Sequence, residues 1–545
     1  MPKVIVAGAS TTLSVKGERR RPRPWQMDLE ETTKGAGLLV YILAGLVIIY
    51  VVAGDLPGLG SRYRKLPQAP VVGARFPFEP RWVTRYRFYS SGWDIIKKGS
   101  ETVPSGLFTV VRPESNITII PRKYVDELAN LTDDRLASNE AIVNDMMGHY
   151  TGAQILLRRY LGHHAVNTKL TPQLHMLVEH IQEELEITAS EDPLNITDEW
   201  SEHRLSPYIY RLMARITSRL FLGVPICRDK RWLQLQLDLV MAIFQTILLM
   251  RNFPRFTHPL LGAVIPARKR LKKCMEELHD FLEPLIEERM AIDAKYNSRG
   301  QMTSDKYEKP NDVMQWMMDI ATDDEYTPDN LANRFVYTIM GSIRSVVEVV
   351  MNCMYELVER PEYIDPIREE MRQVLAEDGG WGKRSAGRML KTDSFIKEIS
   401  RHYPPSALAF RRITKQKIVL HDGLVLPKDT YICIATTSPA QDDVPNPCEF
   451  DGFRYYKERM AHKVGASRYD YASTDSTHIG FGHGRNACPG RFAASLESKM
   501  LLAHIILQFD IKLPPSRTTR PKSVKMMDFK IQDSTATIMM RKLKQ

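Results

Sequence analysis

One cysteine near the C-terminus sits in a local sequence that strongly constrains what this 545-residue chain can fold into. Cys488 follows the glycine-rich turn 480–484, and a predicted helix begins just after Gly490. Glycines carry no side chain that would keep backbone N–H groups away from the sulfur, and the N-terminal end of a helix has a partial positive charge. Both features stabilise a thiolate, the form of cysteine that binds metals. The alternative interpretation is a buried free cysteine in a glycine-rich loop.

The segment around this cysteine resembles the haem-binding loop of the cytochrome P450 family, whose pattern is Phe-x-x-Gly-x-(Arg or His)-x-Cys-x-Gly. Four residues fall on its fixed positions: Phe481, Gly484, Cys488 and Gly490. The chain departs from the pattern at Asn486, where the family has a basic residue. The resemblance implies that Cys488 is the axial thiolate ligand of haem b, and that Arg485 or His483 contacts a haem propionate.

A second pattern lies upstream. Glu398 and Arg401 are three residues apart, on one face of a predicted helix that ends at the pair Pro404-Pro405. Alone, such a pair is usually an exposed salt bridge of little energetic weight. The order Glu-x-x-Arg, then Phe-x-x-Phe-Arg ending at Arg454, then the cysteine loop is similar to the order in haem-thiolate monooxygenases. The resemblance implies that Arg454 joins Glu398 and Arg401 in a structural cluster that supports the haem loop.

Residues 333–360 form a long predicted helix that ends before Pro361. In the resemblance, Gly341 and Ser342 take the two small positions of the family's oxygen-activating motif, and both belong to the expected substrate pocket. Arg344 replaces the family's acid or histidine, and Ser345 replaces its threonine. We predict Ser345 and Arg344 as catalytic candidates: a serine hydroxyl both donates and accepts hydrogen bonds, whereas arginine cannot shuttle protons but can order water or anchor a substrate carboxylate. The alternative is that Arg344 points away into a salt bridge.

The segment after Pro404-Pro405 supplies further candidates. The small and apolar Ala407 and Leu408 are predicted to line the substrate pocket, although such residues more often serve packing alone. Family members place an arginine just beyond, on a haem propionate. This favours Arg412 over Arg411, with Lys169 as a weaker candidate.

The N-terminal region predicts a membrane anchor. Residues 1–34 are polar and basic, and residues 35–54 are an uncharged, mostly apolar run long enough to cross a bilayer as one helix. A cleaved signal peptide or a buried core helix is the alternative. Residues 55–75 are predicted to be a proline-rich linker, followed by one large domain at 76–545. Basic residues flank both ends of the apolar run, so orientation rests on the resemblance, which places the catalytic domain on the cytosolic face of the endoplasmic reticulum.

Periodicity predicts a mainly α fold with small β-sheets, and the resemblance implies that this is the cytochrome P450 fold. Apolar residues recur every three or four positions in four segments: 174–185, 211–221, 233–250 and 268–289. Alternating residues predict strands at 106–111, at 417–426 with a turn at Asp422-Gly423, and in strand pairs over 526–542.

The net charge and the cysteine spacing favour some partners and argue against nucleic-acid binding, disulfides and a zinc site. The net charge of +10 suggests an acidic partner or an anionic membrane surface, and there is no nucleic-acid-binding motif. The six cysteines are widely spaced, which predicts neither a disulfide framework nor a zinc site.

The resemblance implies a monooxygenase that uses O2, a hydrophobic small molecule and electrons from NADPH, in the manner of fungal secondary-metabolism enzymes acting on terpenoids or polyketides. Since no dinucleotide-binding fingerprint is present, a separate NADPH-cytochrome P450 reductase is the expected partner, meeting a basic surface at Arg485 and Arg491. The alternatives are a haem-thiolate enzyme that performs isomerisation, desaturation or oxidative coupling, and a non-catalytic haem-binding membrane protein.

Overall fold

The computed structural model describes residues 45, 63, 66–76, 78–298, 308–382, 384–437, 442, 444–462 and 464–544. The predicted tail and membrane helix at 1–54 lie outside the described residues, apart from Gly45. The chain divides into two units, 1–52 and 53–545, and the second unit carries all of the elements described below. Among the described helices, α9 (Lys230–Arg251) is long and apolar enough to cross a membrane, but 56% of its most apolar stretch is buried inside the protein.

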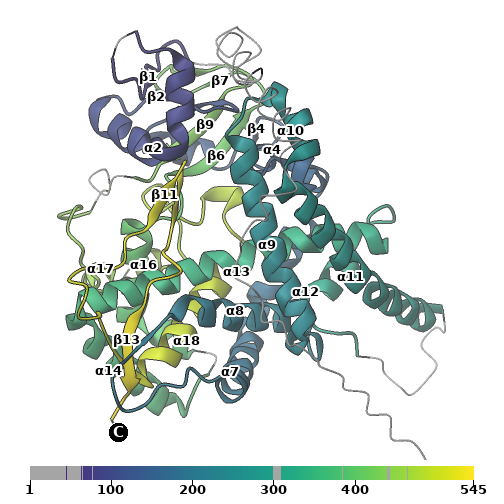
Figure 1. Cartoon of the computed structure of the whole chain (residues 1–545), viewed down its shortest axis with the longest axis vertical. Coiled ribbons are helices and arrows are strands. Elements are labelled where there is room, and N and C mark those ends of the chain that lie inside the picture. Colours follow the sequence, from purple (N-terminus) through teal and green to yellow (C-terminus); the bar gives the residue numbers. More distant parts are fainter. Residues whose placement is uncertain are drawn as a thin grey trace, which may run out of the picture. The chain divides into compact units, whose positions relative to one another are not determined.

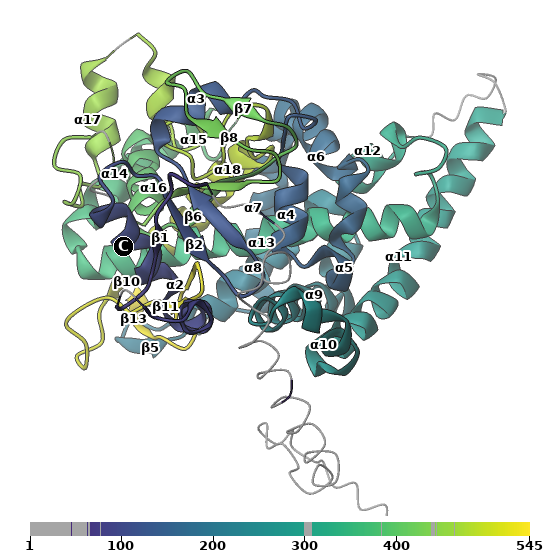
Figure 2. The ribbon, with the colours of Figure 1, turned by 90° about the horizontal axis from the view of Figure 1, so that it is seen from above.

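Helices make up most of this unit, as the periodicity predicts (Figure 1). The long ones are α2 (Arg81–Thr102), α7 (Leu174–Glu191), α8 (Leu205–Phe221), α9, α11 (Pro266–Ser298), α13 (Pro328–Glu359), α14 (Ile364–Asp378), α16 (Leu390–His402) and α18 (Arg491–Ile506). The short ones are α3 (Val125–Leu128), α4 (Asn139–Asp145), α5 (Gly148–Thr151), α6 (Leu161–Ala165), α10 (His258–Val264), α12 (Val313–Ile320), α15 (Ser385–Arg388) and α17 (Arg454–Ala461). Figure 2 shows α9, α10 and α11 next to one another, in agreement with the contacts between them.

The largest sheet has six strands in the order β1 (Val71–Val72), β2 (Phe108–Val111), β3 (Asn116–Ile119), β9 (Tyr431–Ala435), β6 (Leu408–Thr414) and β4 (Leu136–Ala137). Its β1–β2 and β3–β9 pairs are parallel and its other pairs are antiparallel. A three-stranded sheet joins β10 (Phe509–Lys512), β13 (Ile538–Lys542) and β5 (Ser201–His203). Two hairpins complete the strands: β7 (Ile418–Val419) with β8 (Val425–Leu426), and β11 (Val524–Met526) with β12 (Phe529–Ile531).

The globular unit begins earlier than the sequence predicts. Leu66 and Ala69, in the predicted linker at 55–75, are buried in an apolar cluster with residues of β9. The backbone N–H of Thr109 bonds to the carbonyl of Pro70, and β1 adds to the sheet beside β2. The proline-rich segment from 66 onward is therefore docked on the sheet, because its extended backbone can pair with an open strand edge.

Helix α13 is the central packing element of the helical part, in contact with α8, α11, α16 and α18 (Figure 1). Its start is fixed by Thr327, whose side chain accepts from the backbone N–H of Asn330, and by Pro328 in the first turn. Pro361 follows its last turn. Almost every turn of α13 buries apolar side chains, but Gly341 and Ser345, one turn apart at its middle, are exposed.

Candidate active site

The Cys488 loop is a tight turn held by backbone bonds. The N–H of Cys488 donates to the carbonyl of Phe481 at 2.7 Å. Gly482 and Gly484 both have φ near +70°, a conformation that favours glycine. At Gly484 a side chain would also collide with the backbone, since a Cβ there would lie 2.4 Å from the carbonyl oxygen of Ala129. The glycines predicted from the sequence are thus needed both for conformation and for close packing.

The sulfur of Cys488 lies at the start of α18. Burial raises the pKa of the thiol, whereas backbone N–H groups of Gly490 and Arg491 and the charge of Arg491 act to lower it. Arg491 is fixed by a 2.8 Å bond from its side chain to the carbonyl of Cys488. The loop therefore supplies donors for a thiolate, and a cation bound to the sulfur would supply the remaining stabilisation.

The other predicted residues of the loop, Phe481, His483 and Arg485, differ in their contacts and exposure. Phe481 packs on Tyr471, with ring centroids 5.0 Å apart. His483 has partners within the protein: its Nδ1 lies 3.2 Å from the hydroxyl of Thr474 and its Nε2 lies 3.5 Å from Asp126. Arg485 is exposed.

Glu398, Arg401 and Arg454 meet in one buried cluster. Arg401 forms a fork on the carboxylate, with bonds of 2.7 and 2.9 Å, and Nε of Arg454 lies 3.3 Å from the same carboxylate. Both arginines also donate to backbone carbonyls of the segment 445–449. Burial raises the pKa of Glu398, but bonds from His402 and Arg401 and the charge of Arg401 outweigh it and lower that pKa to about 2. This cluster ties the segment before α17 to helix α16.

Arg412, on strand β6, is a buried cation with spare hydrogen-bonding capacity. It is 4% exposed, and its Nη1 donates to the hydroxyl of Ser138 at 3.0 Å and to the carbonyl of Arg411 at 2.9 Å. Its Nη2 has no partner among the described residues, and burial lowers its pKa to about 10. Arg411, by contrast, is neutralised by Asp145 and Asp528 at 2.8 and 2.9 Å. Of the two neighbouring arginines, Arg412 is the one left to bind an anion, and Lys169 is exposed on the surface.

A cavity of about 340 Å³ opens beside the middle of α13. Its lining is mostly apolar, from α4, α9, α13 and β12, and includes Gly341, Arg344 and Ser345. A Cβ at Gly341 would meet nothing within 4 Å, and the hydroxyl of Ser345 donates to the carbonyl of Gly341 at 3.1 Å. The cavity thus offers space for a small molecule next to Gly341 and Ser345, the two predicted site residues at which α13 is exposed.

Three residues predicted for the pocket do not line this cavity. Ser342 bonds to the carbonyl of Ile339 at 2.7 Å. Ala407 and Leu408 are buried in the apolar cluster of the six-stranded sheet, at 0% and 2% exposure. The preceding residues Pro405 and Ser406 reach the cavity instead, as does Phe529 from the second strand of the β11–β12 hairpin.

Arg344 lines the cavity and is also in a salt bridge. It pairs with Glu348 at 2.7 Å, and its guanidinium lies 3.9 Å from the centre of the Phe244 ring on α9. Glu348 lines the same cavity, and burial raises its pKa more than Arg344 lowers it. The sequence analysis missed Glu348, although its spacing of four from Arg344 could have indicated the pair.

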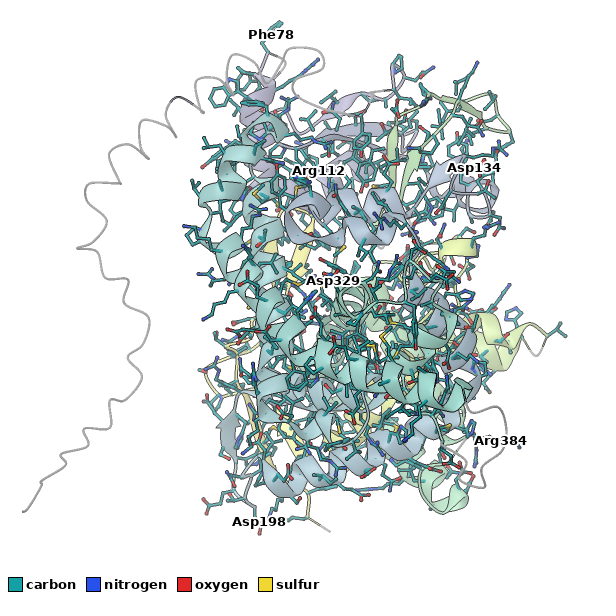
Figure 3. All side chains as sticks on the ribbon, turned by 90° about the vertical axis from the view of Figure 1, so that its right-hand side faces the viewer. Phe78, Arg112, Asp134, Asp198, Asp329 and Arg384 are labelled. Atoms are coloured by element: carbon teal, nitrogen blue, oxygen red, sulfur yellow. The ribbon has the colours of Figure 1, made fainter. Side chains whose placement is uncertain are left out.

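A buried ionic network beside the cavity was also missed. Arg251, at the end of α9, bonds to Glu114 at 3.0 Å and to Asp528 at 2.9 Å. Arg112 bonds to Asp145 at 3.0 Å (Figure 3 labels Arg112). No sequence pattern could have indicated this network, because its members are separated by up to several hundred residues.

These residues fit an iron porphyrin with a thiolate ligand. Cys488 offers a sulfur with backbone donors beside it, Arg412 offers a buried guanidinium whose Nη2 has no partner among the described residues, and Gly341 leaves open space beside α13. The iron of such a cofactor needs a ligand, which a cysteine thiolate can supply, and its propionates are stabilised by a buried cation.

Comparison of the sequence with known proteins supports a haem-thiolate site. The profile described as "Cytochrome P450" matches residues 108–540. Cytochrome P450 monooxygenase AN1598 of Emericella nidulans is 36% identical over 508 residues, covering 93% of this chain and 92% of that protein. Ent-kaurene oxidase P450-4 of Gibberella fujikuroi is 34% identical over 481 residues, covering 87% and 92%.

A solved structure agrees as well. The retinoic acid-bound cyanobacterial CYP120A1 superposes with a TM-score of 0.59 at 16% identity, covering 88% of this chain and all of that one, which supports the predicted mainly helical fold with small sheets. The chain belongs to the cytochrome P450 family and is an oxidoreductase of its monooxygenase class.

Proposed function

We propose that the protein inserts one oxygen atom of O2 into a hydrophobic small molecule, a terpenoid or polyketide intermediate of fungal secondary metabolism. The observation that carries this proposal is the mostly apolar cavity beside α13, which reaches Gly341 and Ser345 at the exposed middle of that helix. The cytochrome P450 monooxygenases among its relatives, ent-kaurene oxidases included, support a terpenoid over a polyketide skeleton.

In this proposal Cys488 is the axial ligand of haem b, and Arg412 binds one propionate through its unpartnered Nη2. A thiolate-bound haem supplies oxygen activation, because the thiolate donates electron density that favours O–O cleavage. Glu398, Arg401 and Arg454 act structurally, by holding the segment that precedes the cysteine loop.

Ser345 is the proposed proton-handling residue. Its hydroxyl can accept a hydrogen bond from water and can donate one, as it does to the carbonyl of Gly341. An arginine side chain does not shuttle protons, so Arg344 is not proposed to deliver them. Its proposed role is to orient groups in the cavity.

Electrons are proposed to come from NADPH through NADPH-cytochrome P450 reductase. The basic residues Arg485 and Arg491 next to the cysteine loop suit an acidic partner surface. Residues 35–54 are proposed to anchor the protein in the endoplasmic reticulum membrane, with the catalytic domain in the cytosol.

A second candidate keeps the haem-thiolate centre but performs isomerisation, desaturation or oxidative coupling. The arginine at position 344, where the family has an acid or histidine, favours this candidate because a changed proton supply alters the fate of bound oxygen.

Two measurements separate these candidates. The reduced, carbon monoxide-bound protein should give the absorption band of a thiolate-bound haem, and its absence would refute both. Turnover with NADPH, reductase and ¹⁸O2 should then yield product that carries the isotope. Product without the label would support the second candidate. Deleting the gene in the producing strain and identifying the compound that accumulates would supply the substrate.

A further inference from the structure

The cavity beside α13 is lined mostly by apolar side chains and by two charged pairs, Arg344 with Glu348 and Arg411 with Asp145. Arg411 is held by a second carboxylate, Asp528, whereas Arg344 has Glu348 alone among the described residues. Arg344 and Glu348 lie one helical turn apart. Their side chains are 23% and 8% exposed, so the pair is largely shielded from bulk water. A buried ion pair costs desolvation energy that a pair of apolar side chains would avoid. Its presence in a pocket for a hydrophobic molecule therefore calls for a reason.

The pair is held rigidly, yet its bonding is incomplete. Nε and Nη2 of Arg344 bond to the same oxygen, Oε1 of Glu348, at 2.9 and 2.7 Å. The guanidinium also stacks 3.9 Å from the centre of the Phe244 ring, which restricts its rotation. Among the described residues, neither Nη1 of Arg344 nor Oε2 of Glu348 has a hydrogen-bond partner, and neither atom is fully enclosed by protein. One donor and one acceptor therefore remain open on residues that line the cavity.

The charges decide which ligand group fits this donor and acceptor. The pair is neutral overall when Glu348 is ionised. A ligand carboxylate would add a further negative charge to a cavity that Glu348 and Asp145 already line, whereas a neutral group would not. A hydroxyl group can accept from one N–H and donate to one carboxylate oxygen at the same time.

We propose, on the basis of the monooxygenase function proposed above, that the substrate is an alcohol whose hydroxyl group binds between Nη1 of Arg344 and Oε2 of Glu348. The rest of its skeleton is a hydrocarbon that fills the apolar part of the cavity. Binding the hydroxyl at one fixed point orients the skeleton, and so selects which carbon is oxidised. The reaction that supplies this substrate is then one that installs a hydroxyl group, an earlier oxygenation or the capture of water by a cyclising terpene.

Ligand binding tests the proposal without turnover. The holoenzyme is titrated with two matched series. The first is abietadiene, abietinol, the methyl ether of abietinol and abietic acid, and the second is farnesene, farnesol and the methyl ether of farnesol. Dissociation constants come from the shift of the haem absorption band. On at least one skeleton the alcohol should bind about tenfold or more tightly than the hydrocarbon, because it bonds to two charged groups. The methyl ether should bind more weakly than the alcohol, since it cannot donate to Glu348.

Variants test whether the preference for alcohols over hydrocarbons arises at the Arg344–Glu348 pair. In Arg344→Met the ratio of hydrocarbon to alcohol dissociation constants should fall to about one. This ratio is measured within one preparation, so it does not depend on the fraction of folded protein. Arg360→Gln is the matched control: Arg360 lies on the same helix, bonds to Glu356 at 2.7 Å and stacks on Phe450, but it does not line the cavity. Its ratio should equal that of the unchanged protein.

Three results would overturn the proposal: alcohols that bind no better than hydrocarbons on either skeleton, abietic acid that binds more tightly than abietinol, or an unchanged ratio in Arg344→Met. An absence of any spectral shift with all of these ligands also counts against it. Failure of the proposed function is distinct, because it appears earlier, as loss of the thiolate-haem band in the carbon monoxide complex.

Discussion

The Glu398 cluster and the Arg344–Glu348 pair differ in how completely their charges are satisfied. The carboxylate of Glu398 accepts from Arg401, Arg454 and the backbone N–H of Asp451. Beside the cavity, both polar contacts of Arg344 go to the same carboxylate oxygen of Glu348. Nη1 of Arg344 and Oε2 of Glu348 remain without a partner among the described residues.

The difference indicates different tasks. A charge with several fixed partners holds chain segments together, since removing one partner leaves the others buried and unsatisfied. A charge with an open atom can bind something that arrives later. The residues of the first cluster match the pattern by which the sequence resembles the family, whereas Arg344 of the second stands at a position that differs from that pattern.

Replacement of the iron ligand should have the largest effect. Cys488→Ser should abolish the thiolate-haem spectrum completely, because a serine hydroxyl is not ionised at neutral pH and does not supply a soft ligand. Cys448→Ser is the control, since Cys448 is an exposed free cysteine. A normal carbon monoxide spectrum in Cys488→Ser would contradict the ligand assignment.

Breaking the Glu398 cluster should have the next largest effect. Glu398→Gln leaves two buried arginines short of a counter-charge, and we expect a loss of about 3 kcal/mol or more in the free energy of unfolding, together with loss of haem. Denaturant unfolding and haem content check this. Glu276→Gln removes an exposed pair with Lys272 and should change stability by less than about 0.5 kcal/mol. Equal losses in the two variants would refute the structural role.

The same carboxyl predicts a pH dependence. The pKa of Glu398 is about 2 in the folded protein and 4.5 in its ordinary state, so the ionised form is favoured by folding. Its contribution to stability is fully present above about pH 4.5 and disappears as the pH falls toward 2. Between these values the unchanged protein should lose stability more steeply than Glu398→Gln, as measured by denaturant unfolding at each pH.

Some parts of the candidate site could be predicted from the sequence, and other parts could not. Cys488, the glycine turn and the Glu398–Arg401 pair follow from short patterns, because local spacing and backbone geometry determine them. Arg454 was assigned to that pair only by the resemblance to the family. The end of α13 before Pro361 was predicted, but the helix begins at Pro328 rather than at the predicted residue 333, because Thr327 caps it. The cavity wall did not follow: Phe244, Ser406 and Phe529 come from distant segments that only the tertiary fold brings together. Residues 66–72 were predicted to belong to a linker, but they dock on the six-stranded sheet, whose edge only the tertiary fold brings next to them.

Arg412 should affect cofactor retention more than stability. Arg412→Leu removes a buried cation whose Nη2 has no protein partner, so the free energy of unfolding of the protein itself should fall little. Haem should instead dissociate about tenfold faster, since one charge-assisted bond is lost. Transfer of haem to apomyoglobin measures that rate. Lys169→Leu, at an exposed candidate for the same task, is the comparison, and equal rates in both variants would argue against Arg412 as the propionate ligand.

Ser345→Ala should have the smallest effect on structure and a selective effect on chemistry. The lost bond is one exposed side chain on the carbonyl of Gly341, so stability should change by less than about 0.5 kcal/mol. If the hydroxyl passes protons, less product should form per NADPH consumed and more hydrogen peroxide should appear. Ser342→Ala is a close control, because Ser342 lies on the same helix, makes the same kind of bond to Ile339 and does not line the cavity. Unchanged coupling in Ser345→Ala would remove this hydroxyl from the mechanism and leave proton delivery to water ordered by the Arg344 and Glu348 pair.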